Sequence, residues 1–148
     1  VVSHGGDLST ASVVGELSGI SAHPSLPRFV SVGETTAILW DVEAHRALRR
    51  VRLPSRGQCV AWCPLGRFVV VGLHNGLFIV FNAAMDLIRE VRASLRRVQC
   101  VRFSTDGSTL AVGTADNLVQ LYDSSNGSSG GSAVPSFDTV GKLAGPKG

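Results

Sequence analysis

Cysteine and histidine are the residues of this chain whose types could do chemistry, because thiolate and imidazole groups bind metals and act as nucleophiles or bases. Cys59, Cys63 and His74 fall within one short segment. A structural zinc site requires four ligands at tight spacing, and this segment offers three. Cys59 and Cys100 also occupy equivalent places in a sequence repeat, which favours packing positions. We therefore expect core cysteines, with no metal site and no cofactor.

Nucleophilic catalysis is the second chemistry that the residue types allow, because Ser25 follows His23 closely. Such catalysis also needs an acid that orients the histidine and donors that bind an oxyanion. No acid or glycine accompanies this pair in a suitable context. We therefore expect no enzymatic activity.

Stacking on nucleic-acid bases is a third possible role, for Trp40 and Trp62. Both stand at positions that the repeat assigns to the core, so we expect them to be packed there.

Arginine is concentrated in one part of the chain, and it is the residue type best suited to binding a partner. Of the 14 lysines and arginines, twelve are arginines between residues 28 and 102, and this window contains only five acids. A guanidinium binds carboxylate or phosphate through paired hydrogen bonds. The alternative interpretation is a solvated edge whose charge prevents strand-to-strand aggregation. The candidate partner-binding residues are Arg46, Arg49, Arg50, Arg52, Arg56, Arg89, Arg92, Arg96 and Arg97.

A repeat of 41 residues must position these arginines. Aromatic residues recur at Trp40, Phe81 and Tyr122, each at the end of an apolar run. Each unit contains short apolar runs separated by turns rich in glycine, proline, asparagine and aspartate. Four short strands in a unit of about 40–45 residues are typical of a propeller blade. The sequence therefore predicts an all-β fold, a WD-repeat β-propeller fragment of about three four-stranded antiparallel blades.

The repeat also predicts the division of the chain. A glycine- and serine-rich run indicates a flexible insert before the last strand. Because closed propellers contain about four to eight blades, we expect these blades to belong to a longer polypeptide. The expected divisions are 1–14, the edge of a preceding blade or a linker; 15–57, blade 1; 58–97, blade 2; 98–143, blade 3 with the insert 124–136; and 144–148, the start of a next repeat.

Three residues are predicted to have structural roles. Trp40 and Asp41 form the WD dipeptide at the end of the third strand of blade 1. Asp116 lies in the turn between the second and third strands of blade 3. An aspartate in a buried turn can accept hydrogen bonds from backbone N–H groups. We expect Asp116 to tie this turn to its blade in that way.

Five segments follow one another with nearly constant spacing, namely 15–24, 57–64, 72–76, 102–113 and 116–122. Together they resemble the corresponding segments of the echinoderm microtubule-associated protein-like (EML) family, in the same order. This resemblance implies that the blades come from the second of two fused propellers. It also implies binding to tubulin or microtubules, often in the spindle or cilium. Related tandem-propeller proteins of centrioles and axonemes share these features.

The resemblance and the basic charge lead to one functional hypothesis, a non-enzymatic microtubule- or tubulin-associated scaffold. The expected partners are tubulin or microtubules and other cytoskeletal or axonemal proteins, without a membrane and with nucleic acid less expected. The odd, sparse set of cysteines argues against a secreted disulfide framework. The expected location is therefore cytoplasmic, on the cytoskeleton, including the cilium, axoneme or centriole. The alternative is a WD-repeat adaptor of an RNA–protein or other multiprotein complex, because arginine also pairs with phosphate.

Overall fold

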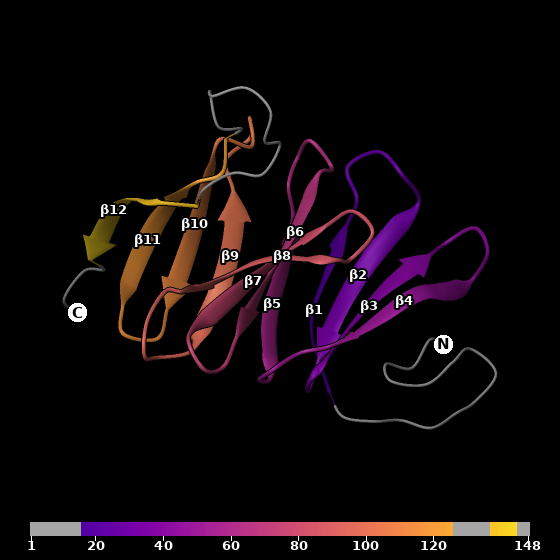
Figure 1. Ribbon diagram of the computed structural model, residues 1–148, viewed down its shortest axis with the longest axis horizontal. Coiled ribbons are helices and arrows are strands. Elements are labelled where there is room, and N and C mark those ends of the chain that lie inside the picture. Colours follow the sequence, from indigo (N-terminus) through magenta and orange to yellow (C-terminus); the bar gives the residue numbers. More distant parts are fainter. Residues whose placement is uncertain (1–15, 126–136, 145–148) are drawn as a thin grey trace.

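The computed structural model describes residues 16–125 and 137–144, which form three four-stranded antiparallel sheets (Figure 1). Blade 1 contains β1 (Leu17–Ala22), β2 (Arg28–Gly33), β3 (Thr36–Asp41) and β4 (Arg46–Arg52). Blade 2 contains β5 (Gly57–Trp62), β6 (Phe68–Leu73), β7 (Leu77–Asn82) and β8 (Leu87–Arg92). Blade 3 contains β9 (Val98–Phe103), β10 (Thr109–Thr114), β11 (Leu118–Asp123) and β12 (Thr139–Ala144). The prediction of an all-β fold with three such blades is confirmed.

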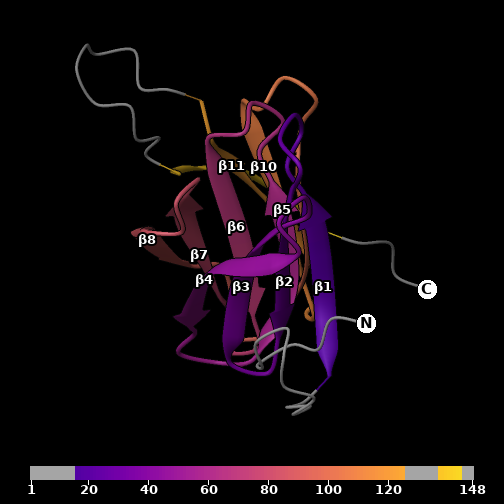
Figure 2. The same ribbon diagram turned by 90° about the vertical axis from the view of Figure 1, so that its right-hand side faces the viewer.

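The three sheets stand in series, and their first strands contact one another. The strand β5 lies against both β1 and β9. Figure 2 shows β1 and β5 on one side of the molecule and the outer strands β4 and β8 on the other. Each strand pairs with the one that precedes or follows it in the chain.

No helix in the described part of the chain is long and apolar enough to cross a membrane.

Each pair of neighbouring blades encloses one apolar cluster. Side chains of a strand point alternately to the two faces of its sheet, so the middle blade contributes to both clusters. Val69 and Val71 of β6 pack toward blade 1, whereas Phe68 and Val70 pack toward blade 3. Because β6 is buried on both faces, its sequence is an almost uninterrupted apolar run. This double burial makes blade 2 the centre of the described structure.

The segment that joins β11 to β12 differs in part from the expected insert. Ser124 is fully buried, and its hydroxyl donates to the Gly107 carbonyl at 2.8 Å. Phe137 is 3% exposed and packs edge-on against Phe68 and Phe78. Ser124, the first residue of the expected insert, is therefore packed against a turn of blade 3. Phe137, the residue directly after the expected insert, is packed against blade 2. The strand β12 continues to Ala144, one residue past the expected end of blade 3.

The remaining expectations about the insert and the chain ends cannot be placed on the structure. The edge or linker expected over 1–14 lies outside the described residues. Most of the expected insert, residues 126–136, lies outside them as well. The same holds for residues 145–148, where the next repeat is expected to begin.

Candidate functional site: the loop edge

One edge of the blades combines two kinds of connection, and we name it the loop edge. It contains the turns between second and third strands (residues 33–36, 73–77 and 114–118) and the loops between blades (53–57 and 93–97). Each interblade loop is hydrogen-bonded to the turn of the blade before it and to the turn of the blade after it. These backbone N–H···O bonds run from Leu53 to Thr35 at 2.7 Å, His74 to Arg56 at 2.8 Å, Ala93 to Gly76 at 2.9 Å and Ala115 to Arg97 at 3.0 Å.

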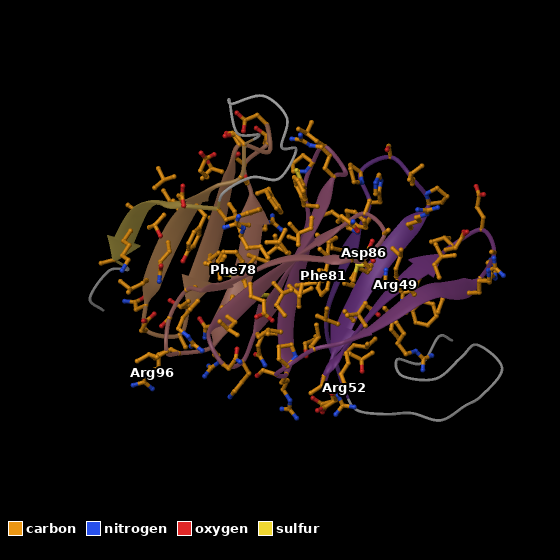
Figure 3. The ribbon with its side chains drawn as sticks, viewed as in Figure 1. Arg49, Arg52, Phe78, Phe81, Asp86 and Arg96 are labelled. Carbon is orange, nitrogen blue, oxygen red and sulfur yellow. The ribbon has the colours of Figure 1, made fainter. Side chains whose placement is uncertain are left out.

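All nine candidate arginines are exposed. The structure brings five of them to the loop edge. Arg56, Arg96 and Arg97 lie in the loops between blades, and Arg52 and Arg92 are the last residues of β4 and β8, directly before these loops, so we count them with the loop edge. Figure 3 shows the labelled Arg52 and Arg96 along the same lower edge of the molecule. The other four candidate arginines lie further from the loop edge, along the outer strands β4 and β8, namely Arg46, Arg49, Arg50 and Arg89.

Several of the nine arginines are bound to groups of the described part of the protein, and three of them have defined hydrogen-bond partners. Arg49 donates to the Ala84 carbonyl at 3.0 Å and to the Asp86 carboxylate. Arg56 donates to the Glu34 carboxylate at 2.9 Å. Arg92 donates to the carbonyl oxygens of Asn75, at 2.9 Å, and Ser94, at 3.1 Å. These three guanidinium groups are partly occupied, which reduces what they can offer to a partner.

Other arginines of the loop edge are more available. Among the described residues, the side chains of Arg52 and Arg97 have no hydrogen-bond or ion-pair partner. The pKa of Asp116 is lowered first by the hydroxyl of Thr114, and the charge of Arg96 adds a smaller effect. Arg96 therefore lies within electrostatic range of one carboxylate but is not hydrogen-bonded to it through its side chain. Arg52, Arg96 and Arg97 form the available cationic set of this edge.

Asp116 differs from its expected environment. The residue is exposed, and its carboxylate accepts hydrogen bonds from two hydroxyl groups, Thr114 Oγ1 and Ser94 Oγ, the latter at 2.8 Å. These bonds lower the pKa of the Asp116 carboxyl. The expectation of a buried turn that is held by backbone donors is wrong. Asp116 instead links the turn of blade 3 to the loop that enters this blade.

The WD dipeptide makes local hydrogen bonds in blade 1. The Trp40 indole Nε1 donates to Ser31 Oγ at 2.8 Å in a buried position. The Asp41 carboxylate accepts the backbone N–H groups of Glu43, at 3.0 Å, and Ala44, at 3.2 Å. Trp40 therefore joins β3 to β2, and Asp41 organises the turn that leads to β4.

The cysteines have three different environments. Cys63 is fully buried, Cys59 is half-buried, and Cys100 is exposed. Burial raises the pKa of the Cys59 thiol to about 12. The expectation of core packing is wrong for Cys100 in the described residues. The strand β9 lies against β5 and the equivalent Cys59, whereas no later blade is present in the described residues to lie against Cys100. In the described ranges, no group of three or more metal-binding side chains is positioned to hold an ion.

The histidine of the other candidate chemistry is part of a turn. His23 Nδ1 accepts the backbone N–H groups of Ser25, at 3.1 Å, and Leu26, at 2.9 Å. The ring also packs edge-on against Trp62 at a centroid distance of 4.7 Å. This arrangement orients the turn between β1 and β2, and the nitrogen that faces Ser25 is occupied by backbone donors.

Sequence reasoning missed one residue of the loop edge. Leu95 lies in the loop between blades 2 and 3 and is 87% exposed. The available signal was an apolar residue directly before two arginines in a segment that contains no strand. This signal was weak, because isolated apolar residues on a protein surface are common.

Comparisons with known proteins agree with this architecture. The family model described as "WD domain, G-beta repeat" matches residues 86–123. Echinoderm microtubule-associated protein-like 3 of Mus musculus is 34% identical over 113 residues, which cover 75% of this chain and 13% of that protein. Echinoderm microtubule-associated protein-like 1 of Rattus norvegicus is 32% identical over 133 residues, which cover 88% of this chain and 16% of that protein.

A human relative is similar to this chain to the same degree. Echinoderm microtubule-associated protein-like 2 of Homo sapiens is 32% identical over 111 residues, which cover 74% of this chain and 17% of that protein. The chain thus spans less than a fifth of the length of these relatives. With its three four-stranded sheets and these matches, the chain belongs to the WD-repeat proteins, and within them it is related to the echinoderm microtubule-associated protein-like family.

Proposed function

We propose that these blades are part of a microtubule-associated scaffold that acts by binding and not by catalysis. The relatives, at 32–34% identity, carry the words microtubule-associated in their names. The structural observation that carries the proposal is the available cationic set of the loop edge, Arg52, Arg96 and Arg97. Guanidinium groups without internal partners suit an acidic protein surface, because they can form planar pairs with carboxylates.

The strength of such a surface comes from the number of its charges. An exposed ion pair contributes only roughly 0–1 kcal/mol, so several pairs must act together. Salt weakens them, because the Debye length falls from about 10 Å at 0.1 M to about 3 Å at 1 M. Arg56 is less suited to this role than the sequence implied, since Glu34 already accepts one of its N–H groups. Of these two candidates, the proposed contact therefore uses Arg52 and not Arg56.

The larger assembly is part of the same proposal. Closed propellers contain about four to eight blades, and the three described blades would therefore belong to a longer ring. We propose that these blades divide at 15–56, 57–97 and 98–144, which moves the expected limits by one residue to include all of β5 and β12. We also propose that they lie within a tandem pair of propellers. The cytoskeletal location would include the spindle, cilium or centriole, and the further partners would be other cytoskeletal or axonemal proteins.

Co-sedimentation of the full-length protein with microtubules tests the proposal. The chain offers two matched double reversals, R52E/R97E at the loop edge and R46E/R89E on the outer strands. All four arginines are exposed and have no side-chain partner among the described residues, so both variants change the same charge without breaking an ion pair.

We expect R52E/R97E to bind microtubules at least tenfold more weakly at low salt and with a flatter salt dependence. R46E/R89E should bind nearly as the parent protein does. Equal binding by R52E/R97E and the parent would exclude the loop edge as the contact. RNA serves as the competing ligand in a parallel assay. Tight RNA binding without microtubule binding would instead support an adaptor of an RNA–protein complex.

A further inference from the structure

Leu95 is the most exposed large apolar residue of the described part of the chain, at 87%. It directly precedes Arg96 and Arg97, which are also exposed. We name these three residues the tip. A single exposed leucine needs no explanation by itself. The tip is different because the backbone that presents it is bonded to both neighbouring blades.

Blade 2 holds the base of the tip through the turn that contains Gly76. The backbone N–H groups of Ala93 and Ser94 donate to the Gly76 carbonyl at 2.9 and 3.3 Å. The Arg92 guanidinium donates to the Ser94 carbonyl at 3.1 Å. Gly76 has a φ of +89°, and a Cβ atom there would lie 1.9 Å from the Ser94 carbonyl oxygen. Only glycine permits this approach of the turn to the loop.

Blade 3 holds the tip from the other side. The Ser94 hydroxyl donates to Asp116 at 2.8 Å and accepts the backbone N–H of Arg96 at 3.0 Å. The backbone N–H of Ala115 donates to the Arg97 carbonyl at 3.0 Å. Residues before and after Leu95 are therefore fixed to the turn of blade 3.

The interior of blade 3 adds one more connection. The buried Tyr122 hydroxyl donates to Gln120 Oε1 at 2.8 Å, and Gln120 Nε2 donates to the Ala93 carbonyl. This chain of hydrogen bonds runs from the apolar cluster between blades 2 and 3 to the base of the loop. The loop thus has few conformations left to lose when a partner binds.

We propose that the tip is a preorganised contact site for an acidic protein surface that has an apolar recess. Leu95 would enter the recess, and Arg96 and Arg97 would pair with carboxylates around it. Interfaces commonly combine an apolar centre with a polar rim, and a rigid loop binds without the entropy cost of ordering. A nucleic acid fits the tip less well, because single-strand binding relies on aromatic side chains that stack on bases. The inference rests on the proposed function and names the contact within it.

Variants of the full-length protein test this inference by co-sedimentation with microtubules at several salt concentrations. L95S removes the apolar group, and L87S is the matched control, because Leu87 is 58% exposed on β8 and lies away from the loop edge. S94A keeps all three tip residues but removes the bonds to Asp116 and to the Arg96 N–H. Circular dichroism and thermal melts confirm that each variant is folded.

We expect L95S to weaken microtubule binding at least fivefold at every salt concentration, without changing the salt dependence. S94A should weaken binding about twofold to fivefold, and L87S should bind as the parent does. If L95S binds as tightly as the parent while R52E/R97E binds weakly, the inference is wrong and the proposed function stands. Equal losses for L95S and L87S, or loss of RNA binding in L95S, would also overturn the inference. A parent protein that binds no microtubules would overturn both.

Discussion

Arg49 on the outer strand of blade 1 donates to the carboxylate of Asp86, which lies directly before the outer strand of blade 2. Figure 3 shows the two labelled side chains pointing toward one another. Arg49 also donates to the Ala84 carbonyl at 3.0 Å. Neighbouring blades are therefore joined by side chains at the outer strands as well as by the backbone at the loop edge.

We expect R49A to lower the melting temperature by only a few degrees at low salt, and by less in 1 M salt. The two side chains are 47% and 57% exposed, and solvent screens exposed pairs. Thermal denaturation of the full-length protein at both salt concentrations measures the effect, and R46A controls for loss of an arginine from the same strand. A large loss of stability that persists in 1 M salt would contradict this interpretation.

Gly76 should tolerate no side chain. We expect G76A to lower the free energy of unfolding by more than about 2 kcal/mol, because the new Cβ would clash with Ser94 and the φ of Gly76 is positive. The matched control is G141A, since a Cβ at Gly141 meets no atom within 4 Å. Urea denaturation should separate the two variants clearly. Similar midpoints for both would show that the turn relaxes without cost.

The ionised Asp106 carboxylate should stabilise the fold, and this stabilisation should be lost in acid. The Ser104 hydroxyl, followed by the N–H and hydroxyl of Ser108, lowers the pKa of the Asp106 carboxyl to about 2. The pKa of Asp106 is about 2 in the folded protein and near 3.8 as its ordinary value. The ionised carboxylate therefore stabilises the fold fully above about pH 3.8, and this stabilisation is lost as the pH falls through about 2.

Titration by NMR measures this effect directly. We expect the Asp106 carboxyl to titrate near pH 2 in the parent protein and at a higher pH in S108A, which removes one donor to the carboxylate. The variant S125A is the control, because Ser125 donates to the carboxylate of Asp123 and not to that of Asp106. An unchanged titration of Asp106 in S108A would show that other groups stabilise its charge.

In the 148-residue chain, Cys100 should be the first thiol to react with an alkylating reagent under native conditions. In the full-length protein, where the proposed ring would place a further blade beside β9, the reaction of Cys100 should be much slower. It is exposed, whereas Cys63 is fully buried. Cys59 has a pKa of about 12 and carries almost no thiolate near neutral pH. Mass spectrometry after brief treatment with iodoacetamide should find the label on Cys100, and the C100S variant should lose the rapid phase. Equal labelling of all three cysteines would indicate that the blades open.

The sequence predicts the strands well, because their residues interact with near neighbours. The run Phe68–Leu73 is apolar throughout, as a doubly buried strand requires, and the aromatic marks give the 41-residue period. The long-range contacts were harder to foresee. Glu34 neutralises Arg56, and Ser94 donates to Asp116, and each pair is separated by 22 residues. Such pairing depends on how a loop lies against a turn, which strand periodicity does not encode.

Cys100 shows a second limit of repeat-based prediction. The repeat places Cys59 and Cys100 at equivalent positions, but their burial depends on what lies beside each strand. Cys59 lies near β9, with its sulfur 4.0 Å from the Val98 carbonyl oxygen. The described residues contain no strand that lies beside β9 in the same way. An equivalent position in the sequence therefore gives the same place in the blade but not the same neighbours.

The spacing between β11 and β12 has a consequence for synthesis on the ribosome. In blades 1 and 2 every strand is followed closely by its partner, whereas β11 ends at Asp123 and β12 begins at Thr139. At roughly 5–20 residues per second, β11 would wait on the order of one to three seconds for its partner to be translated. During that interval its free backbone groups can pair with another chain. The delay makes β11 the strand of this segment that most needs protection, by a chaperone or by rapid completion of blade 3, from aggregation with nascent neighbours.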